Sequence, residues 1–131
     1  MITLNPGMVV AVRCWWGEHW GIVANDQYGR ATVVSNRGIR GSVTEEPWSE
    51  VVGSAEWRVV TDLVSDLPAY FVVERARSKV GTRYAFSTWN CQDLVYWALG
   101  LQPQSPQREM ALGLLSLVCL GVIVRMAARA G

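Results

Sequence analysis

The stretch NCQDLVYWALG, residues 90–100, decides the fold because a helical pattern begins in it after a long run of strand patterns. Asn90 is a favoured N-cap residue, and Gly100 is a favoured residue just beyond a helix end. The residues that share one apolar face at helical spacing are Cys91, Leu94, Val95 and Ala98. The stretch therefore predicts a short amphipathic helix whose first turn carries a cysteine.

Upstream of this helix, short apolar runs alternate with turn signals. The runs predict strands at residues 8–14, 19–25, 31–36 and 56–61, with a loop at residues 37–55. A further helix is expected from Pro68 to Gly81, where apolar residues recur at helical spacing. Sequential strands joined by short turns predict an antiparallel sheet, so the expected fold class is α+β, with a small sheet packed against helices.

Downstream of residue 101 the composition changes. Residues 102–107, QPQSPQ, are typical of a linker between a domain at residues 1–101 and a C-terminal hydrophobic helix at residues 108–131. The uncharged run at residues 110–124 would rise about 22 Å as a helix, less than the roughly 30 Å hydrocarbon core of a bilayer. The tail is thus expected in or on a membrane, or else buried in the domain or a partner. A homodimer formed through this segment also stays open.

Composition narrows the function classes. The 12 basic and 11 acidic residues are scattered, and no basic stripe alternates with aromatics, so no nucleic-acid partner is expected. Three cysteines without a CxxC pair, together with one histidine, indicate neither a disulfide framework nor a metal site, and no cofactor is expected. The N-terminus lacks the pattern of a signal peptide, so we expect a cytoplasmic protein associated with intracellular membranes.

Cys91 is the main candidate for chemistry. A free cysteine on an apolar helix face is most often a core residue. In the first turn of a helix, however, the dipole and unpaired N–H groups favour a thiolate and can stabilise an oxyanion. Neither Cys14 nor Cys119 has such a setting, and both are expected to be packing residues.

A reactive thiol needs a base, and the chain offers only His19. Strand alternation puts His19, Gly21 and Val23 on one face and Trp20 and Ile22 on the other. The missing side chain of Gly21 would leave room for a substrate or a helix end beside the imidazole. The plainer alternative is that His19 is an ordinary half-buried strand residue.

These residues carry a family resemblance. HWGIV at residues 19–23 resembles the H-box, and NCQDLVYWALG resembles the NC motif, of the lecithin retinol acyltransferase-like superfamily, whose members are circularly permuted relatives of NlpC/P60 and papain-type cysteine enzymes. LNPGMVVAV at residues 4–12 resembles the family's opening strand, and residues 74–91 resemble its approach to the NC motif. The likeness covers nearly the whole chain, including an apolar tail after a linker.

The resemblance implies a thiol acyl-transfer mechanism. Cys91 would attack the ester of a phospholipid to form a thioester, with His19 as general base, and water or an amine would take the acyl group. Where small animal members carry a second histidine, this chain has Ser35 or Asn36, either of which would have to orient His19. Gln92 and Asp93 replace the more usual Glu-His. Candidate substrate-binding residues are Trp20, Tyr84 and Asn90, with packing as the alternative for Trp20 and Tyr84.

A second branch of the resemblance implies a different role. Some picornaviral 2A proteins carry the same two motifs and a hydrophobic tail, and the implied role there is in viral replication through host protein or membrane interaction, without catalysis. Such a protein would lie at intracellular membranes of the host cell. Murein or protein hydrolysis, as in NlpC/P60 relatives, is a more distant alternative.

Three further groups of residues carry weaker expectations. Glu45, Glu46 and Glu50 are expected to form a solvated acidic loop, and Asp93 is expected to face away from Cys91. Trp15, Trp16 and Trp20 suit either a membrane-facing rim near the site or core and sheet packing.

Overall fold

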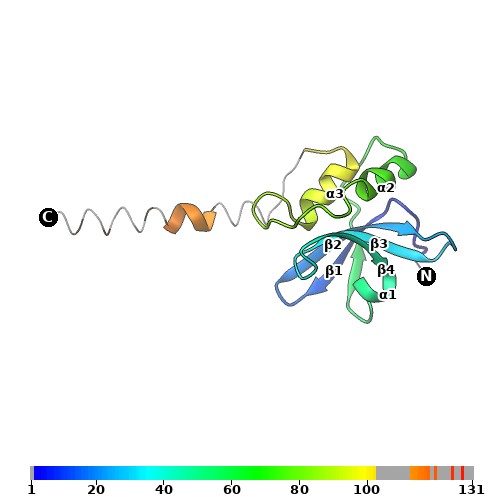
Figure 1. Cartoon of the computed structure of the whole chain (residues 1–131), viewed down its shortest axis with the longest axis horizontal. Coiled ribbons are helices and arrows are strands. Elements are labelled where there is room, and N and C mark those ends of the chain that lie inside the picture. The colour runs from blue at the N-terminus through cyan, green and yellow to red at the C-terminus, as the bar shows by residue number, and fades with distance from the viewer. Residues whose placement is uncertain (1, 103–112, 119, 121–124, 126–127, 129–131) are drawn as a thin grey trace.

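A five-stranded antiparallel sheet forms the centre of the protein, with helices packed on it (Figure 1). The structure, a computed structural model, describes residues 2–102 together with 113–118, 120, 125 and 128. The expected α+β class with an antiparallel sheet is confirmed.

The first four strands form an antiparallel meander, and the fifth strand pairs with the first at the other edge of the sheet. The strands are β1 (Val9–Cys14), β2 (Gly17–Asn25), β3 (Ala31–Arg37), β4 (Ser42–Pro47) and β5 (Trp57–Val59), in the sheet order β4-β3-β2-β1-β5. The helices are α1 (Trp48–Val51), α2 (Ala69–Arg77) and α3 (Cys91–Leu99). Because consecutive strands pair, the β1–β2 and β3–β4 turns lie at one end of the sheet and the β2–β3 turn at the other.

The two faces of the sheet bury different side chains. On one face Trp20, Ile22 and Val34 pack with Leu94 and Val95 of α3 in the main core, which also includes residues of α2. On the other face Val10, Val23 and Val33 pack with partly buried side chains that include Trp48 and Val51 of α1. Figure 1 shows α2 and α3 on one side of the sheet and α1 on the other.

The expected loop at residues 37–55 was wrong. Its middle forms β4, which pairs with β3 in the register Val33↔Glu46 and Asn36↔Val43, and then the short helix α1. Alternation in the strand buries Val43, while the neighbouring glutamates obtain arginine partners from elsewhere in the chain. The partner of Glu45, Arg77, is distant in sequence, whereas the partners of Glu46 come from the adjoining turn and meet it only once β3 and β4 pair.

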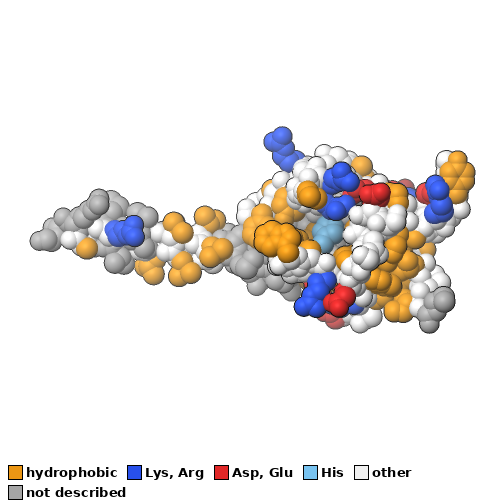
Figure 2. Space-filling view, turned by 90° about the horizontal axis from the view of Figure 1, so that it is seen from below, with side chains coloured by type: hydrophobic (Ala, Val, Ile, Leu, Met, Phe, Trp, Pro, Cys, Tyr) orange, Lys and Arg blue, Asp and Glu red, His pale blue; other side chains and the backbone are white. Residues whose placement is uncertain are grey.

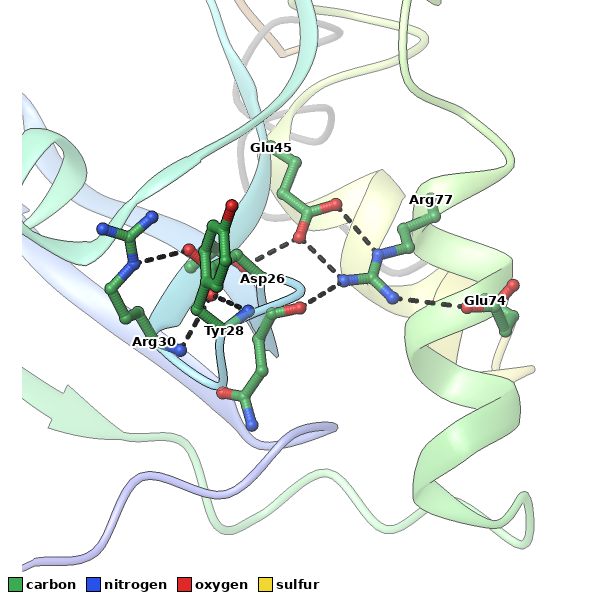
Figure 3. Close-up of polar contacts among 8 residues, drawn as sticks. Asp26, Tyr28, Arg30, Glu45, Glu74 and Arg77 are labelled. Carbon is green, nitrogen blue, oxygen red and sulfur yellow. Dashed lines mark hydrogen bonds and ion pairs between the residues drawn. The ribbon is translucent and has the colours of Figure 1, made fainter.

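Glu45 joins the sheet to α2 through Arg77. The Arg77 guanidinium donates to both Glu45 oxygens at 2.9 Å and to the carbonyl of Asn25 at 2.7 Å, as Figure 3 shows for the ion pair. Glu46 accepts from Arg37 and Arg40, both at 3.1 Å. The expectation of a solvated acidic loop is therefore wrong for Glu45 and Glu46, which are partly buried, whereas Glu50 is exposed.

The predicted helix before residue 81 is confirmed, whereas the described residues do not confirm the C-terminal hydrophobic helix at residues 108–131. The helix expected between Pro68 and Gly81 is α2, which ends at Arg77. Residues 113–118 of the predicted C-terminal helix are helical and exposed, and the linker at residues 103–107 lies outside the described residues. Most of the 119–131 segment, Cys119 included, also lies outside them. Among the residues that are described, no helix is long and apolar enough to cross a membrane.

Replacing Arg77 by leucine should lower the free energy of unfolding by about 1–3 kcal/mol at pH 7, because Glu45 would keep its charge but lose its partner. The hydrogen bonds from Arg77 lower the pKa of Glu45, so this contribution is present above the carboxyl's unfolded pKa and is lost as pH falls through its folded pKa. Urea unfolding at pH 7 and near pH 3 measures both effects. Arg30→Leu, which breaks the surface pair with Asp26, is the control and should cost less than about 1 kcal/mol. Equal losses in the two variants would contradict the assignment.

A cysteine at a capped helix end in an apolar cavity

The position of Cys91 is fixed by the cap of α3. Asn90 Oδ1 accepts hydrogen bonds from the backbone N–H groups of Gln92 at 3.0 Å and Asp93 at 3.2 Å, and Asp93 Oδ2 accepts from the Asn90 N–H at 3.0 Å. This reciprocal capping box confirms Asn90 as the N-cap. Asp93, expected to face away from Cys91, is 1% exposed, and its carboxylate turns back to the helix end.

The loop that leads into α3 is also held by side chains. Asn36 of β3 donates from its amide to the Trp89 carbonyl at 2.9 Å, and Asn90 donates to the Phe86 carbonyl at 2.9 Å. A backbone bridge between Ala85 and Trp89 closes the turn between them. The sheet therefore sets the position of the residue two places before Cys91.

Cys91 lines a cavity of about 530 Å³ at the end of the sheet where the β1–β2 and β3–β4 turns lie. The other polar or ionisable side chains in its wall belong to Arg13, Cys14, His19, Asn36, Arg37 and Tyr84. Much of the remaining wall is apolar and comes from Val12, Trp15, Trp16, Ile39, Val51 and Phe86. Cys91 itself is 1% exposed, so it lies at the inner end of this cavity.

His19 reaches the cavity from the sheet face opposite α3. Its strand neighbour Trp20 packs in the core beneath the helices, whereas Val23, on the same face as His19, packs in the second cluster. Figure 2 shows the chain's one histidine at the surface of the sheet side, with hydrophobic side chains beside it. His19 and Cys91 thus line the same cavity, although His19 lies on the sheet face opposite the one that α3 covers.

The space beside Gly21 is not open to a substrate. A Cβ atom built there would lie 2.4 Å from Cγ1 of Val33, so the neighbouring strand fills the gap. The expectation that Gly21 leaves room beside His19 was therefore wrong. The glycine instead permits close packing of β2 against β3.

Burial lowers the pKa of His19 to about 4, since a charged imidazolium loses solvation there. The positive charge of Arg37 lowers the pKa further, and the carboxylate of Glu46 opposes this. His19 Nε2 is buried and has no hydrogen-bond partner within the part of the chain that the structure describes. The ring is thus neutral at pH 7, with one nitrogen facing no protein partner.

Neither candidate orienting residue bonds to His19. Ser35 Oγ and Asn36 Oδ1 are buried without a hydrogen-bond partner among the described residues, and the Asn36 amide is directed to the Trp89 carbonyl. Asn36 lies on the helix side of β3, as its bond to Trp89 requires, whereas Ser35 shares the face of His19 and Gly21. In this arrangement Asn36 positions the loop before Cys91, and neither Ser35 nor Asn36 orients the imidazole.

Of the three candidate substrate-binding residues, one lines the cavity and two do not. Tyr84 lines the cavity, and burial, followed by the charges of Cys91 and Asp93, raises its pKa. Trp20 and Asn90 do not line it. Trp20 is in the core, with its indole N–H 3.3 Å from Glu18, and Asn90 is 0% exposed because it caps the helix, so both serve packing and structure.

Sequence reasoning missed several residues of the cavity wall, among them Ile39, Phe86 and Cys14. Ile39 stands in the turn RGIRG, residues 37–41, and an apolar residue at such a turn tip was the available signal. The expectation that Cys14 is a packing residue needs revision, since its thiol is only partly buried and its Sγ lies 3.5 Å from the Gly17 carbonyl.

The arrangement offers thiol chemistry in an apolar space. A thiol at a helix N-terminus, a neutral imidazole and a phenol line one cavity large enough for part of an acyl chain. Within the described residues no three His, Cys, Asp or Glu side chains group closely enough to hold a metal ion. No protein-family model matches the sequence, and no curated protein matches it significantly.

Replacing Asn90 by alanine should lower the free energy of unfolding by about 1–3 kcal/mol, since two N–H groups and the Phe86 carbonyl lose their partner. Chemical unfolding followed by circular dichroism measures the loss. Asn5→Ala, at an exposed asparagine near the N-terminus, is the control and should change stability little. An Asn90→Ala protein as stable as wild type would show that the cap does not hold α3.

The low pKa of His19 predicts a pH dependence of stability. Because the folded pKa lies below the unfolded value, the contribution is complete above about pH 6.5 and is lost as pH falls toward 4. Wild type should therefore lose up to about 3 kcal/mol over this range relative to His19→Gln, and less where water reaches the ring. Parallel pH profiles for the two proteins would mean that the imidazole titrates normally.

Proposed function

We propose that the protein is a cysteine-dependent acyltransferase or hydrolase that acts on acyl esters, with Cys91 as nucleophile. The observation that carries the proposal is that Cys91, at a side-chain-capped helix N-terminus, and the chain's single histidine line the same largely apolar cavity. The helix end favours negative charge on sulfur and oxygen, and the apolar wall suits an acyl chain.

The reaction would proceed in two acyl transfers. Cys91 Sγ attacks the ester carbonyl while its proton passes to the neutral His19, and backbone N–H groups at the start of α3 stabilise the oxyanion. The C–O bond then breaks, the protonated imidazole gives its proton to the leaving alkoxide, and a thioester remains on Cys91. Water or an amine displaces the thiol in the second step, with His19 again taking and returning a proton.

The pKa of His19 shapes this mechanism. The low pKa keeps the ring in the neutral form that accepts a proton, although it also makes the ring a weak base. An oxyanion or thiolate that forms nearby would favour the imidazolium by opposite charge. Proton transfer is thus coupled to attack on the substrate, and a preformed thiolate–imidazolium pair is not part of the proposal.

The fold is compatible with the resemblance on which the proposal also draws. A strand that carries the histidine, an antiparallel sheet and a helix that begins at the cysteine suit the circularly permuted papain-like arrangement of the lecithin retinol acyltransferase-like superfamily. We propose that arrangement for the chain, with phospholipid esters as the substrate class and intracellular membranes as the location.

One observation favours a second function. His19 Nε2 has no partner among the described residues, and neither Ser35 nor Asn36 orients the ring. A protein of the picornaviral 2A type, which keeps the two motifs but acts through host proteins or membranes, would need no oriented base. This binding role is the alternative if the thiol proves unreactive toward esters.

The test is to trap the acyl-enzyme. The full chain is incubated with a short-chain phosphatidylcholine in micelles, quenched in acid and weighed by intact-protein mass spectrometry. Wild type should gain one acyl mass on Cys91 that hydroxylamine removes. His19→Gln should slow the acylation by about 100-fold or more, the usual contribution of a positioned base.

The matched control is Cys14→Ala, because Cys14 lines the same cavity but lies outside a helix N-terminus. This variant should acylate within about twofold of wild type, whereas Cys91→Ala should not acylate at all, since only the latter removes the nucleophile. If folded wild type forms no adduct, or if Cys91→Ala still turns over ester, the enzyme proposal fails and the binding role takes its place.

A further inference from the structure

The mouth of the cavity carries large apolar side chains that the fold leaves in solvent. Trp15 is 96% exposed and Ile39 is 86% exposed, and Trp16 and Phe86 are 44% and 40% exposed. All four line the cavity that holds Cys91. Folding gains nothing by placing these side chains in water, so a cluster of this kind around one opening marks an interaction surface.

Two tight turns present these residues side by side. Trp15 and Trp16 form the β1–β2 turn, and Ile39 stands in the β3–β4 turn. In an antiparallel meander both turns lie at the same end of the sheet, and the cavity between them opens there. We call Trp15, Trp16, Ile39 and Phe86 the apolar rim. Figure 2 shows hydrophobic side chains gathered beside the histidine on this side of the molecule.

Positive charge surrounds the apolar rim. The turn sequences RCWW, residues 13–16, and RGIRG, residues 37–41, contain three arginines and no carboxylate. A fourth, Arg83, is exposed and bridges to Ser42 beside the β3–β4 turn. All three turn arginines are ion-paired, Arg13 with Glu56 and both Arg37 and Arg40 with Glu46, so with Arg83 the four arginines exceed these two carboxylates by two charges.

We propose that the apolar rim is a membrane-docking surface that inserts Trp15 and Ile39 into the interface of an anionic bilayer, with the cavity mouth facing the lipid. Tryptophan prefers the headgroup region, and arginines beside it are attracted to anionic lipids. The proposal names the partner of the site described above and rests on the proposed function only in its substrate class. In this arrangement an acyl chain enters the cavity from the bilayer without crossing water.

The experiment measures binding of the full chain to vesicles of phosphatidylcholine with and without phosphatidylserine. The rim variant is Trp15→Ser combined with Ile39→Ser. The matched control is Tyr28→Ser combined with Val64→Ser, two exposed residues that do not line the cavity. The rim variant should bind phosphatidylserine vesicles at least about tenfold more weakly than wild type, and the control should bind like wild type.

A second measurement keeps the proposal testable if residues 108–131 dominate binding. Vesicles made with brominated lipid quench tryptophans that enter the bilayer. Trp15→Phe should remove a large share of the quenching, whereas Trp97→Phe, on α3 and stacked with Arg75 and Lys79, should not. Equal quenching in wild type and Trp15→Phe would overturn the proposal. So would a dimer that only the rim variant loses, because the rim would then bind a second copy.

The experiments distinguish failure of the enzyme proposal from failure of the membrane-docking proposal. Cys91→Ala should bind vesicles like wild type, since docking needs no chemistry at sulfur. If micellar ester acylates Cys91 but the rim variant binds and quenches like wild type, only the docking surface is wrong. If rim-dependent docking is found without acylation, only the enzyme proposal is wrong.

Discussion

The capping box at the start of α3 is the interaction on which the site depends. The Asn90 side chain accepts hydrogen bonds from buried N–H groups of the first helical turn, and the Asp93 carboxylate accepts one from the Asn90 N–H. These bonds fix Cys91 as the first helical residue. Buried backbone N–H groups without partners would otherwise destabilise this helix end. Asn90 also donates a hydrogen bond to the Phe86 carbonyl. Asn36 of β3 donates one to the Trp89 carbonyl, and this bond connects the loop before the cysteine to the sheet. A cysteine in such a place is positioned with little freedom, as a nucleophile must be.

Much of the fold was predictable because its signals are local. Alternating apolar residues and turn residues predicted four strands, and Asn90 with Gly100 predicted both ends of α3, which the structure confirms. The fifth strand, β4, was missed because its glutamates suggested a solvated loop. Glu45 is in fact paired with Arg77, far along the chain, and Glu46 with Arg37 and Arg40 across the adjoining turn. Ion pairs between distant segments leave no mark in local composition, and a strand rich in carboxylates therefore resembled a loop.

The site was predictable only in part, because some of its features follow from local sequence patterns and others depend on how side chains pack in the folded protein. Cys91, His19 and Tyr84 do line one cavity, whereas Trp20 and Asn90 are structural. Strand alternation already placed Trp20 and His19 on opposite faces of β2, so the sequence indicated that they would not line the same site. The packing of Val33 into the space beside Gly21, and the absence of a hydrogen bond between His19 and either Ser35 or Asn36 among the described residues, depend on side-chain positions that no spacing rule specifies.

In the proposed function, Cys91 and His19 act together as one reactive site. The most direct test is the rate at which iodoacetamide alkylates Cys91, followed by mass spectrometry from acidic to alkaline pH in wild type and His19→Gln. If His19 takes the Cys91 proton as sulfur attacks, the substitution should slow alkylation of Cys91 by at least about tenfold at neutral pH. The two rates should converge at alkaline pH, where the thiol ionises unaided. Equal rates at every pH, in two proteins of equal stability, would contradict the claim and would leave Cys91 as a core residue beside an unrelated histidine.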